Sequence, residues 1–209
     1  MKTLVLVKRS LVLGACLLAL GLATSCSKAP DTELLAAQES LATAREAEAE
    51  DYAYREYSAA RESLEVAQRL ISEQDSKFSL TRKYDHARDL LAESCSLASA
   101  ARESAGIAKE RTKEEALAMI FEAEQALNAS RDLLVNAPVG KGNRADIELM
   151  KADLNALAPS LEEAQAAYDD GNFMSAKSNA MVVLTKAGGI SDEIRAAMAI
   201  QQTSGTKKP

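Results

Sequence analysis

From residue 31 onward, apolar side chains recur at alternating steps of three and four residues, with polar and charged side chains between them. This spacing places the apolar positions on one face of a helix. The first two stripes consist of Leu34, Ala37, Leu41 and Ala44, and of Ala53, Tyr57, Ala60, Leu64, Ala67 and Ile71. They predict a helix that is capped by Asp31 or Thr32 and runs to about Ser72. Residues 73–79 then have the composition of a turn.

A longer stripe follows this turn, and it is rich in alanine and serine. Its first part is Leu80, Tyr84, Ala87, Leu91, Ser94, Ala98, Ala101, Ala105 and Ala108. After a phase shift near Thr112 it resumes as Ala116, Ile120, Ala123, Leu127, Ser130 and Leu134. The pattern predicts either one helix over residues 80–136 or two helices with a bend at Gly106. Because alanine and serine are small, helices that pack on this face can approach closely.

Residues 137–143 are the clearest loop in the chain, and two further helices follow it. We expect Asn143 to cap the first, whose apolar stripe is Ile147, Met150, Leu154, Leu157, Leu161, Ala164 and Tyr168. Pro159 lies off this stripe and is expected to kink the helix without ending it. Gly171 and Asn172 predict the end of this helix and the start of the next.

The last helix is marked by Phe173, Ala176, Ala180, Val183, Leu184 and Ala187. We expect Gly188-Gly189 to break it and Ser191 to restart it. Residues 201–209 are polar and are expected to form a disordered tail.

Two segments of the chain repeat. Residues 63–68 (SLEVAQ) match residues 160–165 (SLEEAQ), and Tyr84 with Ala87 matches Phe173 with Ala176 further on. Each copy is a helix, a turn, and an aromatic residue with an alanine that would dock the returning helix. The repeated unit is therefore an αα-hairpin.

These patterns predict an all-α fold of elongated antiparallel helical hairpins, or a helical bundle with coiled-coil-like heptads. Residues 31–136 would form a long first hairpin, and residues 144–200 a second hairpin packed on its end. The favoured arrangement packs the third and fourth helices against residues 110–136 as a three-helix bundle. Nine glycines and four prolines are too few for a loop-rich β-sandwich or barrel.

The N-terminus has the pattern of a targeting segment. Residues 1–25 contain Lys2, Lys8 and Arg9 and no acidic residue, followed by an apolar run over residues 11–23. A basic start, a short apolar region and small residues indicate a secretory signal peptide. The run is shorter than the roughly 20 residues that a spanning helix needs. A retained membrane anchor is the alternative.

Residues 22–26 (LATSC) resemble the lipobox of bacterial lipoprotein precursors, in which small residues precede a cysteine. The resemblance implies cleavage after residue 25, lipidation of Cys26 with acyl chains such as palmitate, and a lipidated linker over residues 26–30. A second box that ends at Cys16 would leave a very short apolar region after Arg9. Ser27 is compatible with export to the outer membrane, facing the periplasm; the inner membrane is the alternative.

The helical part of the chain also resembles a family. Residues 57–64 (YSAARESL) and 84–88 (YDHAR), behind a lipoprotein signal, look like domain of unknown function 4398. That family consists of small helical envelope proteins, some of which carry a peptidoglycan-binding domain of the outer-membrane-protein-A type. The resemblance covers roughly residues 30–105 and includes no peptidoglycan-binding domain, so it implies neither an activity nor wall binding.

The charge balance bears on the partners. The chain has 25 Lys and Arg against 31 Asp and Glu, and removal of residues 1–25 would take away three positive charges and no negative one. Such an acidic chain repels phosphate backbones, so nucleic-acid binding is not expected. We also expect its body to stand away from anionic lipid surfaces.

Candidate chemistry is sparse. His86, the only histidine, is expected on the surface, and Cys95 as a small buried helix residue, with an intermolecular bridge or a reactive thiol as alternatives. The acidic run 46–51 fits a solvated helix face better than a cation patch. The Gly-Lys-Gly segment 140–142 lacks the context of a phosphate loop. We therefore expect no enzyme, no cofactor and no metal site.

The sequence thus favours a non-enzymatic envelope lipoprotein, anchored through Cys26, that acts as a helical spacer, scaffold or adaptor for a protein partner. Self-association through its heptads is compatible with the pattern. The alternative is a periplasmic binding module for a small ligand, a cation or a cell-wall fragment. It would use the acidic run 46–51 or a pocket between alanine-lined helices.

Overall fold

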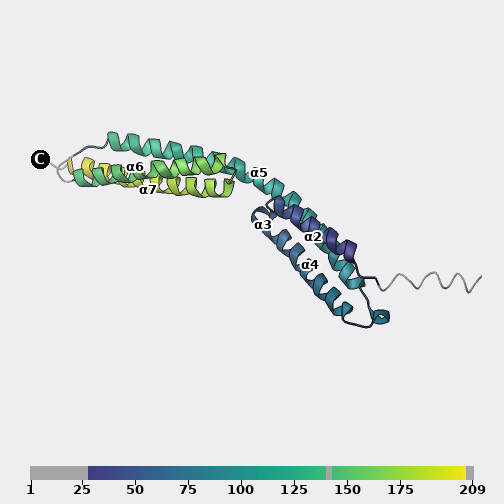
Figure 1. Cartoon of the computed structure of the whole chain (residues 1–209). Helices are drawn as coiled ribbons and strands as arrows, with labels where there is room; N and C mark the ends of the chain where they lie inside the picture. The colour runs from purple at the N-terminus through teal and green to yellow at the C-terminus, as the bar shows by residue number, and fades with distance from the viewer. Residues whose placement is uncertain (1–27, 140–142, 206–209) are drawn as a thin grey trace, which may run out of the picture. The chain divides into compact units, whose positions relative to one another are not determined.

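A computed structural model describes residues 28–139 and 143–205, and its fold is all-α, as expected. The signal peptide, Cys16, Cys26 and Ser27 lie outside the described residues, as does the segment 140–142. The elements are α2 (Asp31–Glu46), α3 (Ala49–Tyr52), α4 (Tyr54–Asp75), the short 3-10 helix η2 (Ser79–Thr81), α5 (Asp85–Val135), α6 (Arg144–Asp169) and α7 (Phe173–Gly205). They form two units that divide between Ile107 and Ala108, and α5 contributes to both (Figure 1).

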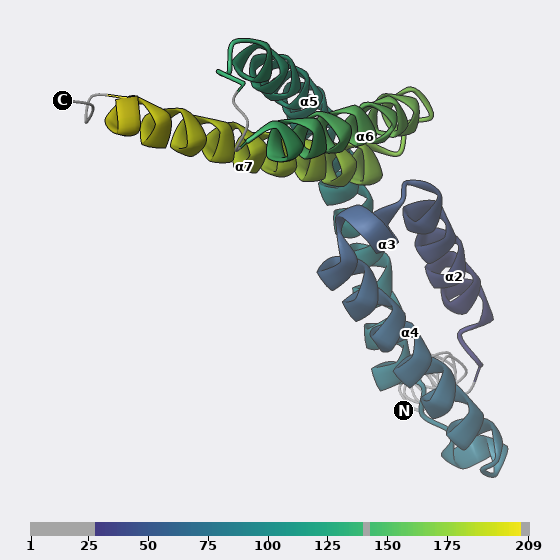
Figure 2. The same cartoon turned by 90° about the vertical axis from the view of Figure 1, so that its left-hand side faces the viewer.

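Unit 1, which comprises the described residues up to Ile107, is a three-helix bundle of α2, α4 and the first part of α5 (Figure 2). One cluster of its core consists of Ala44, Ala49, Ala53, Tyr57, Ala60, Ala98, Ala101 and Ala105. The other consists of Ala37, Leu64, Ala67, Ile71, Tyr84, Ala87 and Leu91. Inside the bundle, the Ser94 hydroxyl donates to the Ala60 carbonyl at 2.8 Å, which joins α5 to α4 where the helices approach closely.

The single helix expected from residue 31 to about Ser72 is wrong. α2 ends at Glu46, Glu48 adopts a left-handed conformation with a φ of 58°, and α3 and Ala53 lead into α4. The physical reason is burial. The reversal buries Ala44, Ala49 and Ala53 together and lets α2 pack back along α4, whereas one straight helix would leave the stripe of α2 in water. The acidic run 46–51 is therefore a helix reversal and not a continuous helix face.

Two smaller expectations at the ends of these helices are also corrected. α2 begins at Asp31 with Pro30 at the N-cap position, so neither Asp31 nor Thr32 caps it. α4 continues to Asp75, and Leu80 lies in η2 with 85% of its side chain exposed, outside the core stripe. The buried stripe of α5 begins instead with Tyr84.

Unit 2, which comprises the described residues from Ala108 onward, packs α6 and α7 with the second part of α5 as a three-helix bundle. The buried core contains Ala116, Ile120, Ala123, Leu127, Leu134, Leu154, Leu157, Ala164, Phe173, Ala176, Ala180, Val183, Ala187 and Ile194. Between α5 and α7, the Ser130 Oγ lies 2.9 Å from the Ala187 carbonyl oxygen and 2.7 Å from the Ser191 Oγ. The cores of the two units consist of different residues.

Glycine and proline interrupt the long helices less than expected. α5 is continuous through Gly106, and α7 is continuous through Gly188-Gly189, so the expected break there is wrong. A helical glycine costs only about 1 kcal/mol relative to alanine, and Ala187 and Ile194 are buried on either side. α7 runs to Gly205, so residues 201–205 are helical and not a disordered tail. Pro159 lies inside α6 and does not end it.

The connection between α6 and α7 follows the expected pattern. Gly171 has a φ of +80°, and its N–H donates to the Tyr168 carbonyl. The N–H of Asn172 reaches the Ala167 carbonyl at 2.8 Å, which completes a Schellman cap. The Asn172 side chain then accepts from the Ser175 N–H at 3.2 Å and caps α7. At the start of α6, Asn143 occupies the N-cap position, but its side-chain amide donates to the Pro138 carbonyl.

The sequence repeat coincides with equivalent core positions in the two bundles. Ala67 and Ala164 are both buried, as are Tyr84 and Ala87 in unit 1 and Phe173 and Ala176 in unit 2. Extending the alignment places Ala60, Ala101 and Ala105 of unit 1 opposite Leu157, Ile190 and Ile194 of unit 2. Unit 1 is thus the bundle with the smaller core side chains.

Candidate functional site

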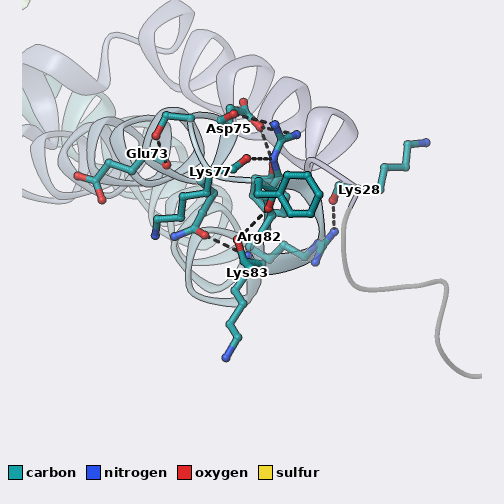
Figure 3. Close-up of polar contacts among 12 residues, drawn as sticks. Lys28, Glu73, Asp75, Lys77, Arg82 and Lys83 are labelled. Atoms are coloured by element: carbon teal, nitrogen blue, oxygen red, sulfur yellow. Dashed lines mark hydrogen bonds and ion pairs between the residues drawn. The ribbon is translucent and has the colours of Figure 1, made fainter.

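The predicted lipid attachment site, Cys26, comes shortly before the first described residue, Lys28. The described chain therefore starts at the end of unit 1 where α2 and α5 begin. The carbonyl of Lys28, the first described residue, accepts a hydrogen bond from Arg88 Nη2 at 2.8 Å (Figure 3). Arg88 lies in the first turn of α5 and also pairs with Glu33 at 3.3 Å. The Thr32 hydroxyl and then Arg88 hold the pKa of Glu33 below its ordinary value. These contacts fix the start of the body to this end of unit 1.

The turn between α4 and α5, residues 76–84, lies at the same end and has its own hydrogen-bond network (Figure 3). Arg82 donates to the carbonyls of Asp75 at 2.7 Å and Lys77 at 3.0 Å. The Lys83 N–H donates to the Gln74 side chain at 3.0 Å. The Tyr84 hydroxyl donates to the Asp75 carboxylate, and this bond raises the pKa of Tyr84. Side chains of the turn and of the last residues of α4 therefore tie the turn to the end of α4.

This ordered turn exposes two large apolar side chains that sequence reasoning missed. Phe78 is 71% exposed and Leu80 is 85% exposed. The spacing of Leu80 from Tyr84 fits a helix and predicts a place for Leu80 in the core stripe. A better signal was available, because Phe78 and Leu80 lie in a short polar turn with Lys77, Arg82 and Lys83 and no acidic residue.

The acidic run 46–51 makes local contacts at the end of α2 and in α3. Arg45 pairs with Glu50 at 3.5 Å, and Ala49 inside the run is fully buried. Across residues 28–139 and 143–205, no group of three or more His, Cys, Asp or Glu side chains is placed to hold a metal ion. The run therefore serves the helix reversal between α2 and α4.

The two isolated reactive side chains belong to unit 1. His86 is exposed on the first turn of α5, as expected. Cys95 is a free thiol that is half-buried and packs against the core cluster containing Leu91, so it is less buried than expected. Among the described residues, no hydrogen bond or ion pair engages the His86 imidazole or the Cys95 thiol.

Each unit also has surface depressions. In unit 1 an open groove between α2 and α5 is lined by Ser40, Thr43, Ala98, Ser99, Arg102 and Glu103. In unit 2 an apolar pocket of about 110 Å³ includes Leu134, Ile147, Met150, Ile194 and Met198. Sites for small molecules usually measure roughly 300–1,000 Å³, so this pocket is too small for most ligands.

Within the part of the chain that the structure describes, no helix combines the length and apolar content needed to cross a bilayer. No family model, no curated protein and no solved structure matches the chain.

Proposed function

We propose that this protein is a non-enzymatic envelope lipoprotein, anchored by acyl chains on Cys26, whose helical body acts as a spacer, scaffold or adaptor. The observation that carries the proposal is the N-terminal sequence. A basic start, a short apolar run and the segment LATSC end five residues before α2 begins at Asp31. Each buried methylene of an acyl chain contributes about 0.8 kcal/mol, so two or more long chains make release from the membrane negligible.

The body supports a role in presenting helix surfaces. In unit 2, α5 exposes Leu117 (52%) and Phe121 (60%), which are one helical turn apart and lie outside the buried core. Exposed apolar side chains at this spacing suit contact with a helix or groove of a protein partner. The acidic net charge of the chain makes a nucleic acid an unsuitable partner.

The anchor is tested in cells with a matched pair of cysteine variants. C26A should abolish acylation, measured by palmitate labelling and by the mass of the processed N-terminus. C16A should be acylated like the wild type, because Cys16 leaves with the signal peptide. Wild type and C16A are expected in the outer-membrane fraction. An acylated C26A protein would contradict the proposal.

The adaptor role is tested by crosslinking in the same cells. A specific partner should be captured with the wild type and be reduced by L117S/F121S and by C26A. T185S, an exposed position elsewhere in unit 2, serves as a control. If the same bulk envelope proteins are captured with every variant, the adaptor role is wrong.

A second candidate is a binding module, which the polar groove between α2 and α5 favours. Ser40, Thr43 and Ser99 offer hydroxyls beside the opposite charges of Arg102 and Glu103. Titration calorimetry with soluble wall fragments should then give a signal that R102A removes. The absence of heat with wall fragments and with divalent cations would leave the adaptor as the better account.

A further inference from the structure

The exposed apolar pair in the turn 76–84 lies beside cationic side chains. Phe78 is 71% and Leu80 85% exposed, and Lys77 and Lys83 are exposed next to them. Among the described residues, no ion pair engages the ammonium group of either lysine. An aromatic ring, an aliphatic side chain and two amines on one turn combine the chemistry that suits a lipid headgroup region.

The network around Arg82 holds these side chains outward. Arg82 uses its guanidinium to bind the Asp75 and Lys77 carbonyls, and the Thr81 hydroxyl donates to the Phe78 carbonyl at 2.8 Å. The turn does not need to rearrange to present Phe78 and Leu80 to a surface. A preorganised contact loses less conformational entropy on binding.

The turn also lies near the predicted lipid. The Lys28 carbonyl is held by Arg88, four residues after Tyr84, and Figure 3 shows Lys28 in the same region as Arg82 and Lys83. Lys28 follows Cys26 by two positions, a span of about 7 Å when fully extended. Acyl chains on Cys26 would therefore enter the bilayer close to this end of unit 1.

The charges around the turn indicate which kind of membrane surface it would bind. The chain as a whole carries a net charge of −6, yet residues 76–84 contain three cationic side chains and no acidic one. The acids that directly flank the turn are paired: Asp75 faces Arg82 and Tyr84, and Asp85 faces Arg88. Glu73, an exposed acid, lies further back in α4. An anionic surface is thus repelled by most of the chain and attracted at this turn.

We propose that the turn 76–84 is a second membrane contact that inserts Phe78 and Leu80 between the headgroups of a bilayer containing anionic phospholipid, while Lys77 and Lys83 bind the phosphates. The contact rests on the proposed anchor, because the lipid on Cys26 brings this end of unit 1 to the membrane. It adds to that function an orientation of unit 1, with the turn facing the lipid.

The chain contains no tryptophan, so a single one can report on this turn. The test uses the chain from residue 26 onward, which contains every described residue, with C95S. Cys26 is coupled chemically to a maleimide lipid in vesicles with about a third of anionic phospholipid, so the test does not depend on acylation in cells. The F78W tryptophan should emit at shorter wavelength and be quenched by brominated acyl chains. F121W, an exposed phenylalanine of unit 2, should do neither.

The lysines are tested without the tether. Each cation near an anionic surface contributes about fivefold to binding, so K77Q/K83Q should lower the partition coefficient roughly 25-fold. K151Q/K186Q, two exposed lysines of unit 2, should leave it unchanged. Equal losses with both pairs would overturn the proposal.

Other results with F78W would also overturn it. An emission spectrum that does not change on tethering means that the turn stays in water. A shift that appears without vesicles and grows with protein concentration means that a second copy of the chain covers the turn. Either result leaves the acylation test of Cys26 unaffected, so failure of this contact and failure of the anchor are distinguishable.

Discussion

At the scale of single residues, unit 1 depends on alanine. Its core places Ala60, Ala101 and Ala105 at positions where unit 2 has leucine or isoleucine. The Ser94 hydroxyl reaches the Ala60 carbonyl across the interface because both helices approach closely there. The small side chains are therefore required by the distance between the helices, and they were predictable from the alanine-rich stripe.

This requirement predicts the effect of enlarging one of them. A101L should destabilise the protein by about 1–3 kcal/mol, because the added methyl groups have no space between the helices. A100L places the same side chain at the adjacent exposed position and should change stability by less than about 0.5 kcal/mol. Urea denaturation measures both. If A101L were as stable as A100L, the close packing of unit 1 would be wrong.

A surface ion pair should make the stability of unit 2 depend on pH. Lys177 of α7 lies 2.6 Å from Glu115 of α5, and its hydrogen bond lowers the pKa of Glu115 from an ordinary value of 4.5, with Arg111 adding to the effect. A carboxyl whose pKa is lowered by folding stabilises the protein above its unfolded pKa and loses this contribution as the pH falls through its folded pKa.

We therefore expect E115Q to be less stable than the wild type at pH 6 and the difference to shrink as the pH falls below about 4.5. Because the pair is partly exposed to solvent, high salt should also reduce the difference. E114Q removes one charge from the exposed neighbour and serves as the control. Thermal denaturation across this pH range measures the effect, and a difference that grows at low pH would contradict it.

At the scale of elements, the phase of the apolar stripe decides whether a helix continues. Ala105 and Ala116 are eleven residues apart, so at about 100° per residue they lie on the same face and α5 runs through. Ala44 and Ala53 are nine residues apart, which would place them on opposite faces of one helix. Both alanines are buried, so the chain reverses between them. This break could have been predicted from the spacing.

The glycine pair Gly188-Gly189 misleadingly indicated a helix break. Gly188 and Gly189 lie between Ala187 and Ile194, which are seven residues apart and both buried, and this packing keeps α7 helical. The glycine pair was expected to break the helix because its intrinsic helix propensity is low. Burial of the residues on either side outweighs that propensity.

Three glycine variants test this account. A Cβ at Gly189 or Gly106 would meet no atom within 4 Å, so G189A and G106A should each stabilise the protein by about 0.5–1 kcal/mol. G171A should destabilise it by about 1–2 kcal/mol, because its φ is +80°. Thermal denaturation of the three variants measures the order of their stabilities. A stabilising G171A would contradict the cap described for α6.

At the scale of the whole molecule, the sequence determines the helical class, while the anchoring site rests on the N-terminal pattern alone. The bundle of α2, α4 and α5 was not predicted, because the reversal after Glu46 contains no glycine or proline. The exposed turn 76–84 was missed because helical spacing alone does not distinguish a buried Leu80 from an exposed one. Only the packing of α2, α4 and α5 shows where the core ends.

Because the two units have separate cores, a core mutation in one unit should loosen mainly the helices of that unit. Leu91 in unit 1 and Leu154 in unit 2 are both fully buried, so L91A and L154A should each cost about 2–5 kcal/mol. Hydrogen exchange should rise mainly in α2 and α4 with L91A, and mainly in α6 and α7 with L154A. Equal increases in both sets of helices with either variant would show that the two cores unfold as one.

The alanine core of unit 1 has a thermal consequence. The heat-capacity change of unfolding grows with the apolar area that becomes hydrated. A buried alanine contributes less apolar area than a buried leucine or isoleucine. Unit 1 should therefore have a smaller heat-capacity increment for its size than unit 2, and a flatter dependence of stability on temperature. The half of the protein nearest the proposed anchor would then be the half whose folding changes least between cold and warm surroundings.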